Sequence, residues 1–421
     1  MTGRIFDITI ENVFSFGEKA TLSMQGVDLD SKSGNYDFIN DNIVLRTAVI
    51  YGANGSGKTN FIKFLDFFLS KLRESMDSDK NSGYFGFYEP FLLDKLKSRK
   101  DAESSVVFRF YVQIGDVQRL YTYAVSFNRQ SFLKEILSYK IDGAEIPLYT
   151  RRTDRRSGDS SVEYSFSEPS FSAGSVTSTR LVLNLFLSNH NDDVSPAAEF
   201  LAGIEFANGY NRNMFERMWA DTKPWLNSSP KHLLKLEEFL KHVDVQFQSI
   251  TVPEGPNARI EDLTFQHAVY KDNDLAGSTT FPYIKESVGT SSLFLLGSKV
   301  LQALEKGCPL LVDEMDSNFH GFVTKFIVQM FQDKRINHNG SQLILTTHNI
   351  SLMDEKLLRK DQVWFTNKNK KGSSELYSLA DFDEVREDSK FVDWYMASRF
   401  GGVPIIDFSM INLFQDGQTN H

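Results

Sequence analysis

The sequence predicts an α/β fold in which a mixed central sheet is flanked by an antiparallel side sheet and a compact, mainly helical insertion. Three observations predict it. An apolar strand runs into a glycine-rich loop at residues 52–59 and then into a helix, a second apolar strand ends in the acids Asp313 and Glu314, and alternating apolar segments occur between residues 106 and 139.

The N-terminal part is predicted to begin with a β-hairpin, because apolar and polar residues alternate over 5–10 and again over 20–24, with turn residues between. Polar residues 30–40 predict a loop, and the apolar run 43–50 predicts one buried strand. Residues 60–72 carry apolar side chains at helical spacing. Strand, glycine loop and helix therefore follow one another directly.

The middle of the chain predicts strands, then a loop, then helices. Residues 106–112, 120–127 and 136–139 alternate as antiparallel strands do, whereas 152–175 is rich in Ser, Arg, Asp and Gly and predicts a flexible loop. A mainly helical pattern over 180–243 precedes a predicted strand at 245–252. We therefore expect an N-terminal lobe at 1–150, a loop and mainly helical insertion at 151–250, and a C-terminal lobe at 251–421.

The composition indicates a globular protein and disfavours several partners. Of 421 residues, 41% are hydrophobic and 24% are charged, and the formal net charge is −9. This charge disfavours extensive contact with DNA, although basic clusters at 95–100 and 151–156 leave local contact open; solvated loop charge is the simpler interpretation of both. No membrane-spanning run or signal peptide is evident, and the single Cys308 excludes an intrachain disulfide, so we expect a cytoplasmic protein without membrane contact.

The glycine-rich segment GANGSGKT at residues 52–59 matches the phosphate-binding loop G-x-x-x-x-G-K-[ST]. Its glycines let backbone N–H groups surround phosphate oxygens at a helix N-terminus. Lys58 is expected to reach the β and γ phosphates of ATP, and Thr59 to ligate Mg²⁺. The candidate nucleotide-binding residues here are Asn54, Gly55, Ser56, Gly57, Lys58, Thr59 and Asn60.

Two acids follow the apolar residues 310–312, a position where a carboxylate pair is unusual unless it has a function. Asp313 is expected to hold Mg²⁺, directly or through water, and Glu314 to act as the general base that polarises the attacking water. Another apolar strand, at 342–346, is followed by His348. On pattern alone, a histidine at that place is more often a satisfied polar residue than a catalytic one.

Residues 285–290 precede a predicted apolar helix at 293–304 and lie upstream of Asp313. Ser287, Gly289 and Thr290, at a helix N-terminus, would form a second phosphate-binding corner. An ordinary helix cap by Ser287 or Thr290 is the open alternative.

Taken together, these motifs resemble the ABC-class ATPases of bacterial abortive-infection and anti-phage defence, relatives of the ATPase half of the overcoming-lysogenisation-defect nucleases. The resemblance covers nearly the whole chain. Besides the motifs above, it rests on IENVFSFGE at 10–18, DEMDSNFH at 313–320, TTHN at 346–349, RKDQVWF at 359–365, ELYSL at 375–379 and RFGGVP at 399–404.

The resemblance implies an ABC-type ATPase head that uses ATP and Mg²⁺, with Lys58, Glu314 and His348 in catalysis and His348 against the γ-phosphate. It also implies a homodimer that holds ATP between the phosphate loop of one subunit and Ser287 and Gly289 of the other, while a larger homo-oligomer stays open. Asp316 would lie at the dimer seam. No Q-loop glutamine is assigned; the nearest candidate by position is Glu89.

The leading hypothesis is an ATP-driven sensor or scaffold of an anti-phage system, which responds to a phage-derived trigger and controls a separate effector of nuclease or toprim type. The alternative is a DNA-repair or nuclease-type ATPase acting directly on DNA, which the acidic charge and the lack of coiled-coil heptads disfavour. Residues 349–421 are too few to complete the ATPase and add a toprim domain, which disfavours a stand-alone nuclease. A transporter subunit would need a more typical signature and tail.

Overall fold

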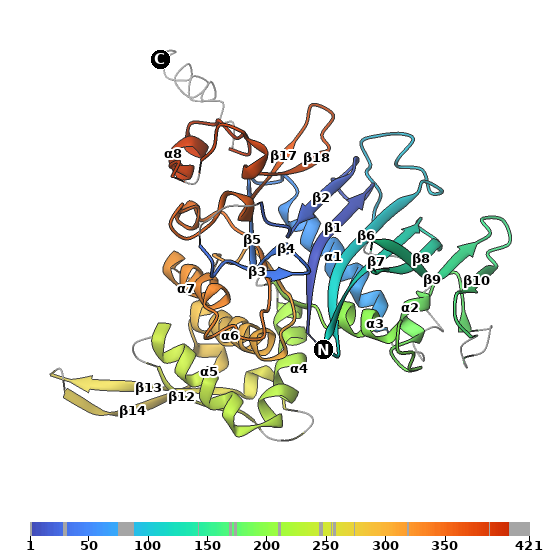
Figure 1. The fold of residues 1–421 in the computed structure, drawn as a ribbon. Helices are drawn as coiled ribbons and strands as arrows, with labels where there is room; N and C mark the ends of the chain where they lie inside the picture. The colour runs from blue at the N-terminus through green and yellow to red at the C-terminus, as the bar shows by residue number, and fades with distance from the viewer. Residues whose placement is uncertain are drawn as a thin grey trace, which may run out of the picture.

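A computed structural model describes residues 2–27, 32–74, 88–141, 143–167, 171, 175–208, 212–243, 247–253, 255, 258–272, 274–317, 320–386 and 388–403 (Figure 1). Residues 30–31, 168–170, 172–174, 209–211, 245–246, 318–319 and 404, which belong to predicted segments, lie outside the described residues. In the described parts of the chain, no helix is both long and apolar enough to cross a membrane.

The central sheet is mixed, as predicted. Its six strands have the order β11-β15-β16-β5-β17-β18, and all neighbours are parallel except β17 and β18, which pair antiparallel. Because strand and helix alternate along the chain here, parallel pairing is the expected outcome. The strands are β5 (Thr47–Gly52), β11 (Glu205–Asn208), β15 (Leu310–Asp313), β16 (Leu343–Thr346), β17 (Val363–Lys368) and β18 (Ser374–Ser378).

The predicted antiparallel side sheet is confirmed and is larger than the sequence indicated. It has seven strands in the order β10-β9-β8-β7-β6-β1-β2, and it includes the predicted N-terminal hairpin of β1 and β2. Its strands are β1 (Gly3–Glu11), β2 (Ala20–Ser23), β6 (Ser104–Ile114), β7 (Val117–Phe127), β8 (Phe132–Ile141), β9 (Ala144–Thr153) and β10 (Ser160–Tyr164).

Two hydrophobic cores lie on opposite faces of the central sheet, because side chains alternate along each strand. On β5, Ala48 and Ile50 face the first core, where helix α1 (Lys58–Arg73) packs between the two sheets. Val49 and Tyr51 face the second core, which is shared with the later helices. The remaining helices are α2 (Val182–Leu185), α3 (Ser195–Ala202), α4 (Arg212–Ser228), α5 (Pro230–Val243), α6 (Val288–Lys306), α7 (Gly321–Gln332) and α8 (Phe391–Met396).

A three-stranded sheet forms an arm that projects from the body on the α5 side (Figure 1). Its strands have the order β12-β13-β14, and the chain runs from the end of β14 into the segment that precedes α6. The predicted strand at 245–252 is thereby confirmed as β12. The arm strands are β12 (Phe247–Thr251), β13 (Thr264–Lys271) and β14 (Asp274–Pro282).

Two predictions for the N-terminal part are wrong. The polar segment 30–40 contains strand β3 (Tyr36–Ile39), and the single strand predicted at 43–50 is two strands, β4 (Asn42–Leu45) and β5. The break falls at the buried Arg46, whose guanidinium bonds Asp37 at 2.7 and 2.9 Å. Since β4 pairs with β3 while β5 pairs with β16 and β17, the chain changes sheets at this residue.

One further prediction fails in the middle of the chain, and another missed a strand. Residues 160–164 form strand β10 rather than a flexible loop, with Tyr164 packed against the first core. The mainly helical prediction for 180–243 is confirmed by α2, α3, α4 and α5. It did not include β11, which is a strand of the central sheet, parallel to β15. A short strand between helices carries too few residues for its alternation to be recognised.

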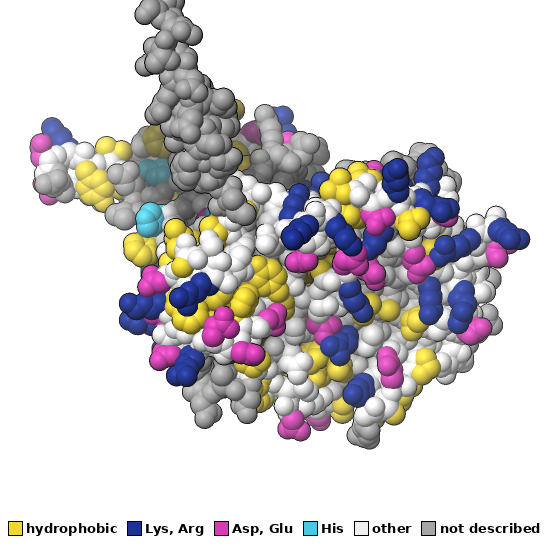
Figure 2. All heavy atoms as spheres, turned by 90° about the horizontal axis from the view of Figure 1, so that it is seen from above, with side chains coloured by type: hydrophobic (Ala, Val, Ile, Leu, Met, Phe, Trp, Pro, Cys, Tyr) yellow, Lys and Arg dark blue, Asp and Glu magenta, His cyan; other side chains and the backbone are white. Residues whose placement is uncertain are grey.

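The basic clusters differ from one another. Near residue 100 the charges are solvated, as predicted: Lys97 pairs with Glu18 at 2.8 Å, and the exposed Arg99 pairs with Asp101. Arg151 is instead fully buried, so the solvated interpretation is wrong for it. Figure 2 shows Lys and Arg side chains interleaved with Asp and Glu over the face seen from above, rather than a continuous basic surface.

Candidate functional site

The phosphate-binding loop connects β5 to α1, as its sequence requires. β5 ends at Gly52 and α1 begins at Lys58. Gly55 and Gly57 have φ of 74° and 123°, values that L side chains rarely adopt. A Cβ on Gly57 would also lie 2.8 Å from Cβ of Ser374, so glycine is needed there for space as well as for conformation.

A group of hydroxyls supports the loop from behind. Ser374 Oγ donates to the Ser56 carbonyl at 2.5 Å and is hydrogen-bonded to Ser15 Oγ at 2.8 Å, and Asn60 Nδ2 donates to Ser15 Oγ at 2.9 Å. Ser56 Oγ bonds Thr366 Oγ1 at 2.6 Å. These contacts join the loop to β17, to β18 and to the turn after β1, so its shape is held before any ligand binds.

Lys58 lies in the floor of the loop and is 4% exposed. Its Nζ donates to the carbonyls of Gly52 at 2.8 Å and Ala53 at 3.2 Å. Burial lowers the pKa of this ammonium, while Glu314 and Asp313 act in the opposite direction. A desolvated cation with only neutral acceptors bonded to it is ready to exchange them for phosphate oxygens.

Asp313 and Thr59 face each other at the ends of β15 and α1. Thr59 Oγ1 lies 3.4 Å from Asp313 Oδ1, which also accepts a 2.6 Å bond from Thr346 Oγ1. Burial raises the pKa of this carboxyl. A hydroxyl and a carboxylate are hard oxygen donors, and their juxtaposition fits the Mg²⁺ that accompanies a bound nucleotide.

Glu314 is held in an unusual backbone conformation. Its φ is 45°, which is uncommon for a residue with a side chain. Its N–H donates to Thr346 Oγ1 at 2.6 Å, so one threonine hydroxyl positions both acids. Sequence reasoning assigned no role to Thr346, because its partners lie 32 and 33 residues away.

His348 follows β16 and lies beside these acids. Asp316 Oδ1 accepts from Thr347 Oγ1 at 2.6 Å and from the His348 N–H at 3.3 Å, which fixes the turn that carries the imidazole. Burial and the nearby Lys58 lower the pKa of His348, so its neutral form is favoured at pH 7.

These elements converge on one cavity of about 400 Å³. It combines backbone N–H donors of a helix N-terminus, an ammonium, a carboxylate and an imidazole, which is the chemistry that a polyphosphate and an attacking water require. Its lining residues are Asn54, Gly55, Gly57, Lys58, Thr59, Asn60, Glu314 and His348.

The second predicted phosphate corner lies elsewhere in the chain. Ser287 is the N-cap of α6, where its Oγ accepts from the Thr290 N–H at 3.0 Å, and Thr290 is buried. Ser287, Gly289 and Thr290 do not line the cavity of the phosphate loop. The cap is thus present, and a nucleotide contact by these residues stays a prediction that needs a second copy.

Glu89, the nearest Q-loop candidate, is not part of the cavity lining either. Its carboxylate forms an ion pair with Arg129, and its carbonyl accepts from the Phe14 N–H at 2.7 Å. These contacts tie the segment before β6 to the turn between β7 and β8 and to the turn after β1.

Comparison with known proteins gives one family match. Residues 48–354 match the family model described as an AAA domain, putative AbiEii toxin, type IV TA system. No curated protein sequence matches the chain.

Among solved structures, a SmcHead bound to the C-winged helix domain of ScpA is 15% identical, with a TM-score of 0.43, covering 89% of this chain and 97% of that one. A Smc head with an extended coiled coil, bound to the C-terminal domain of ScpA and derived from Pyrococcus furiosus, is 12% identical, with a TM-score of 0.44, covering 90% and 96%.

Proposed function

The chain belongs to the family of AAA domains described as putative AbiEii toxins of type IV TA systems, and from this premise we propose that it binds and hydrolyses ATP as the sensor or scaffold of an anti-phage system. One observation carries the ATPase part of the proposal. The phosphate loop, Glu314 and His348 line one cavity, with Asp313 and Thr59 at its base.

In the proposed reaction, Lys58 exchanges its bonds to the loop carbonyls for bonds to the β and γ phosphates. Thr59 and Asp313 would hold Mg²⁺, which supplies neutralising charge at the phosphate oxygens. Water forms a bond to the γ-phosphorus while the bond to the bridging β–γ oxygen breaks, and Glu314 takes the proton of the water. The neutral His348 can donate a hydrogen bond to the γ-phosphate.

We also propose that ATP pairs two copies of the chain, with Ser287 and Gly289 of one copy closing the nucleotide on the other. The position of these residues outside the cavity of their own chain supports this arrangement. Pairing gives the chain two states, the single copy and the ATP-bound pair. A phage-derived trigger could shift the equilibrium between them, and a separate effector protein would respond to the paired state. The family description names a putative toxin, which supports a proposed output that acts against the infected cell.

ATP turnover by the purified chain tests the first part of the proposal. Glu314→Gln should bind ATP with unchanged affinity and release phosphate at least about 100-fold more slowly, because an amide cannot accept the proton of the water. Glu375→Gln, at an exposed position outside the cavity, is the matched control and should turn over normally. Equal turnover in all three proteins would remove the assignment of Glu314.

The sensor part of the proposal is tested in cells that express the chain with or without the product of its neighbouring gene. These cells are then challenged with phage. Protection should need both proteins and should be lost with Glu314→Gln. Full protection by this chain alone would replace the separate effector with an activity of the chain itself.

A further inference from the structure

Three exposed leucines lie on the loop before β6, and we call them the leucine patch. Leu92, Leu93 and Leu96 are 58%, 70% and 73% exposed. Single exposed apolar side chains are common on protein surfaces, whereas three within five residues are unusual unless something covers them. The loop therefore carries a candidate docking surface.

The backbone of this loop is held in place. The Asn12 side chain accepts from the Phe91 N–H at 3.1 Å and donates to the carbonyls of Lys97 and Glu103 at 3.2 and 3.0 Å. The leucines are thus presented from a fixed base, which lowers the entropy that an occupant would have to remove.

The leucine patch lies among basic residues. Residues 91–100 carry four basic side chains and one acid. Lys95 and Lys100 are exposed, and neither ammonium forms a hydrogen bond or an ion pair with any residue that the structure describes. The acids nearby are engaged: Glu18 pairs with Lys97 at 2.8 Å, and Asp94 Oδ1 accepts from backbone N–H groups of its own loop at 2.8 and 3.3 Å.

The tip of the β17–β18 hairpin adds to this charge. Its segment 368–372 is KNKKG, and its three lysines are exposed. A Cβ on Gly372 would lie 2.6 Å from Cδ1 of Leu93, so the tip adjoins the leucine patch, and both lie at the same end of the molecule as α8 (Figure 1). An apolar surface among lysines favours an occupant that carries apolar and acidic side chains together.

Residues 405–416 of the same chain have that composition. Their sequence, IIDFSMINLFQD, holds seven apolar side chains, two acids and no basic residue. Ile406, Met410 and Leu413 recur at the spacing of one helix face. Burial of so apolar a segment against another surface is favourable, because it removes apolar area from water. These residues lie outside the part of the chain that the structure describes.

The last described residues lie within reach of the leucine patch. A Cβ on Gly401 would lie 2.9 Å from the Tyr377 hydroxyl and 3.4 Å from Asn367 Nδ2, so the chain leaves α8 beside the base of the β17–β18 hairpin. From residue 367 to residue 372 the hairpin extends at most about 17 Å. Twelve residues span about 18 Å as a helix and about 40 Å when extended. Residues 405–416 can therefore reach the patch in either conformation.

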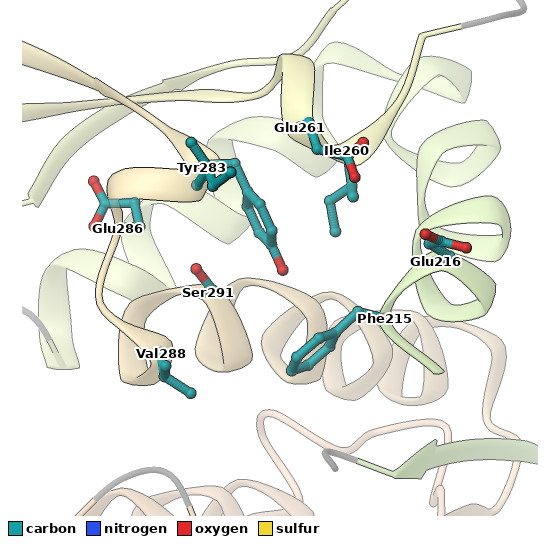
Figure 3. Close-up of a pocket in the computed structure, with 9 residues that line it drawn as sticks. Phe215, Glu216, Ile260, Glu261, Tyr283, Glu286, Val288 and Ser291 are labelled. Atoms are coloured by element: carbon teal, nitrogen blue, oxygen red, sulfur yellow. The ribbon is translucent and has the colours of Figure 1, made fainter. Parts of the chain in front are cut away.

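Another exposed apolar surface fits this segment less well. It is a pocket of about 250 Å³ beside the first turn of α6, where the Tyr283 ring extends between Ile260 and α6 (Figure 3). Its lining residues come from α4, from α6 and from the short segments before β13 and after β14. None of these lining residues is basic, and none belongs to α8 or to the β17–β18 hairpin.

We propose that residues 405–416 dock on the leucine patch of the same copy, with their apolar side chains on the three leucines and their acids beside the lysines of 95–100 and 368–371. This contact needs no nucleotide and stands independently of the proposed function. The docked segment would follow the β17–β18 hairpin, whose Ser374 supports the phosphate loop. It would also keep the leucines from contact with other molecules.

Crosslinking in the full chain tests this contact. Leu96→Cys and Ile411→Cys are introduced together and treated with a short bismaleimide, and we expect mass spectrometry to find the two positions linked. The native Cys308 does not interfere, because it is buried and burial raises the pKa of its thiol to about 12. Met396→Cys in place of Leu96→Cys is the matched control, since Met396 is 59% exposed and closer to residue 411 along the chain. Equal linkage from 396 and 96 would show an undocked segment and overturn the proposal.

Isotope labelling shows which copy the segment docks on. Chains of natural and of heavy nitrogen are mixed in equal amounts before crosslinking. Docking within one copy gives light–light and heavy–heavy linked peptides only. Mixed peptides amounting to about half of the product, the fraction expected for random pairing of copies across a symmetric contact, would show docking on a second copy and reject the proposal.

Protection of a thiol on the patch is the second measurement. The thiol of Leu96→Cys should react with a soluble maleimide at least about tenfold more slowly than in a chain that also carries Ile411→Asp and Leu413→Asp, a factor equal to about 1.4 kcal/mol of docking free energy. Leu275→Cys, exposed on the arm, should react equally with and without the two aspartates. Equal rates at position 96 would contradict the docking. Protection that appears only with the purified product of the neighbouring gene would assign the patch to that protein instead.

Discussion

Two clusters of buried charge lie near opposite ends of α1, one at its first residue, Lys58, and one beside α2, whose Asn184 bonds the Leu72 carbonyl. They differ in how many of their polar atoms have hydrogen-bond partners. In the side sheet, Glu135 and Arg151 are both 0% exposed, with 3.6 Å between Oε2 and Nη1. The Glu135 carboxylate accepts from Tyr123 and Tyr149 at 2.9 and 2.8 Å and from two backbone N–H groups at the start of α2 at 2.8 and 2.9 Å. The acceptors of this carboxylate are filled, although the buried Arg151 Nε has no hydrogen-bond partner among the residues that the structure describes. We call this the closed cluster.

The cluster in the phosphate loop is open. Glu314 and Lys58 line a cavity, and Lys58 bonds only backbone carbonyls at the distances of a hydrogen bond. Burial lowers the pKa of Lys58 and raises that of Asp313, so both charges cost folding free energy. A buried carboxylate whose hydrogen bonds are all made within the protein stabilises the fold. Charges that line a cavity stay desolvated and can bind a ligand. The two should therefore respond to mutation in opposite ways.

The largest effect is expected at the closed cluster. In Glu135→Gln, one carboxylate oxygen is replaced by an amide NH₂, which cannot accept the hydrogen bonds that this oxygen accepted. Arg151 would also stay buried without its counter-charge. The free energy of unfolding should therefore fall by about 3–5 kcal/mol. Urea denaturation measures it. Glu163→Gln, at an exposed position of β10, should change stability by less than about 0.5 kcal/mol. A loss at Glu135 no larger than at Glu163 would contradict the filled network.

At the open cluster, removing a charge should lower the affinity for ATP rather than the free energy of unfolding. Lys58→Met should lower ATP affinity by about 10- to 150-fold, the range for losing a charge-assisted hydrogen bond of about 1.5–3 kcal/mol. The free energy of unfolding should stay level or rise, since a desolvated ammonium is removed. Calorimetric titration and urea denaturation measure the two quantities. Lys63→Met, an exposed lysine of the same helix, should leave ATP affinity unchanged.

The same contrast explains what the sequence could predict. Residues 52–59 and 313–314 are contiguous signals whose chemistry is local, and the structure brings them together with His348. Arg151 could not be predicted as buried, because a charged residue beside a polar, Ser- and Gly-rich stretch is usually solvated. Its burial is compensated by Glu135 on the neighbouring strand and by the carbonyls of Thr177 and Arg180, which the sequence pattern does not reveal. The hydroxyls of Thr346 and Ser374 were missed for a similar reason, since their partners lie far away in sequence.

Thr346 lets the arrangement of the open cluster be tested without touching its charges. Thr346→Val keeps the shape of the side chain but removes the hydroxyl that bonds Asp313 and the Glu314 N–H. We expect ATP turnover to fall about tenfold and stability to fall by about 1–2 kcal/mol, because a part-buried N–H loses its acceptor. Thr346→Ser keeps the hydroxyl and should recover most of the turnover. Identical rates for the two variants would show that the hydroxyl does not position the acids.

The smallest effect is expected from Asp313→Asn, and it has a characteristic pH dependence. The pKa of Asp313 in the folded protein lies above its ordinary value of 3.8, chiefly through burial. Ionising this carboxyl therefore costs folded-state free energy. Its stability contribution is fully present below pH 3.8 and is lost as the pH rises through the folded-state pKa. Asn has no such loss, and its Oδ1 can still accept from Thr346 and Thr59.

Without nucleotide, Asp313→Asn should thus become more stable than the wild type by on the order of 1 kcal/mol at pH 7, and the difference should shrink as the pH falls toward 4. Mg-ATP should reverse the order, because a ligand that binds only the folded state stabilises it, and the variant has lost a metal ligand. Urea denaturation from pH 4.5 to 7.5, with and without Mg-ATP, measures both effects. A wild type that is the more stable of the two at pH 7 without nucleotide, and loses that advantage as the pH falls, would show that the surroundings favour the ionised Asp313 and would contradict the open cluster.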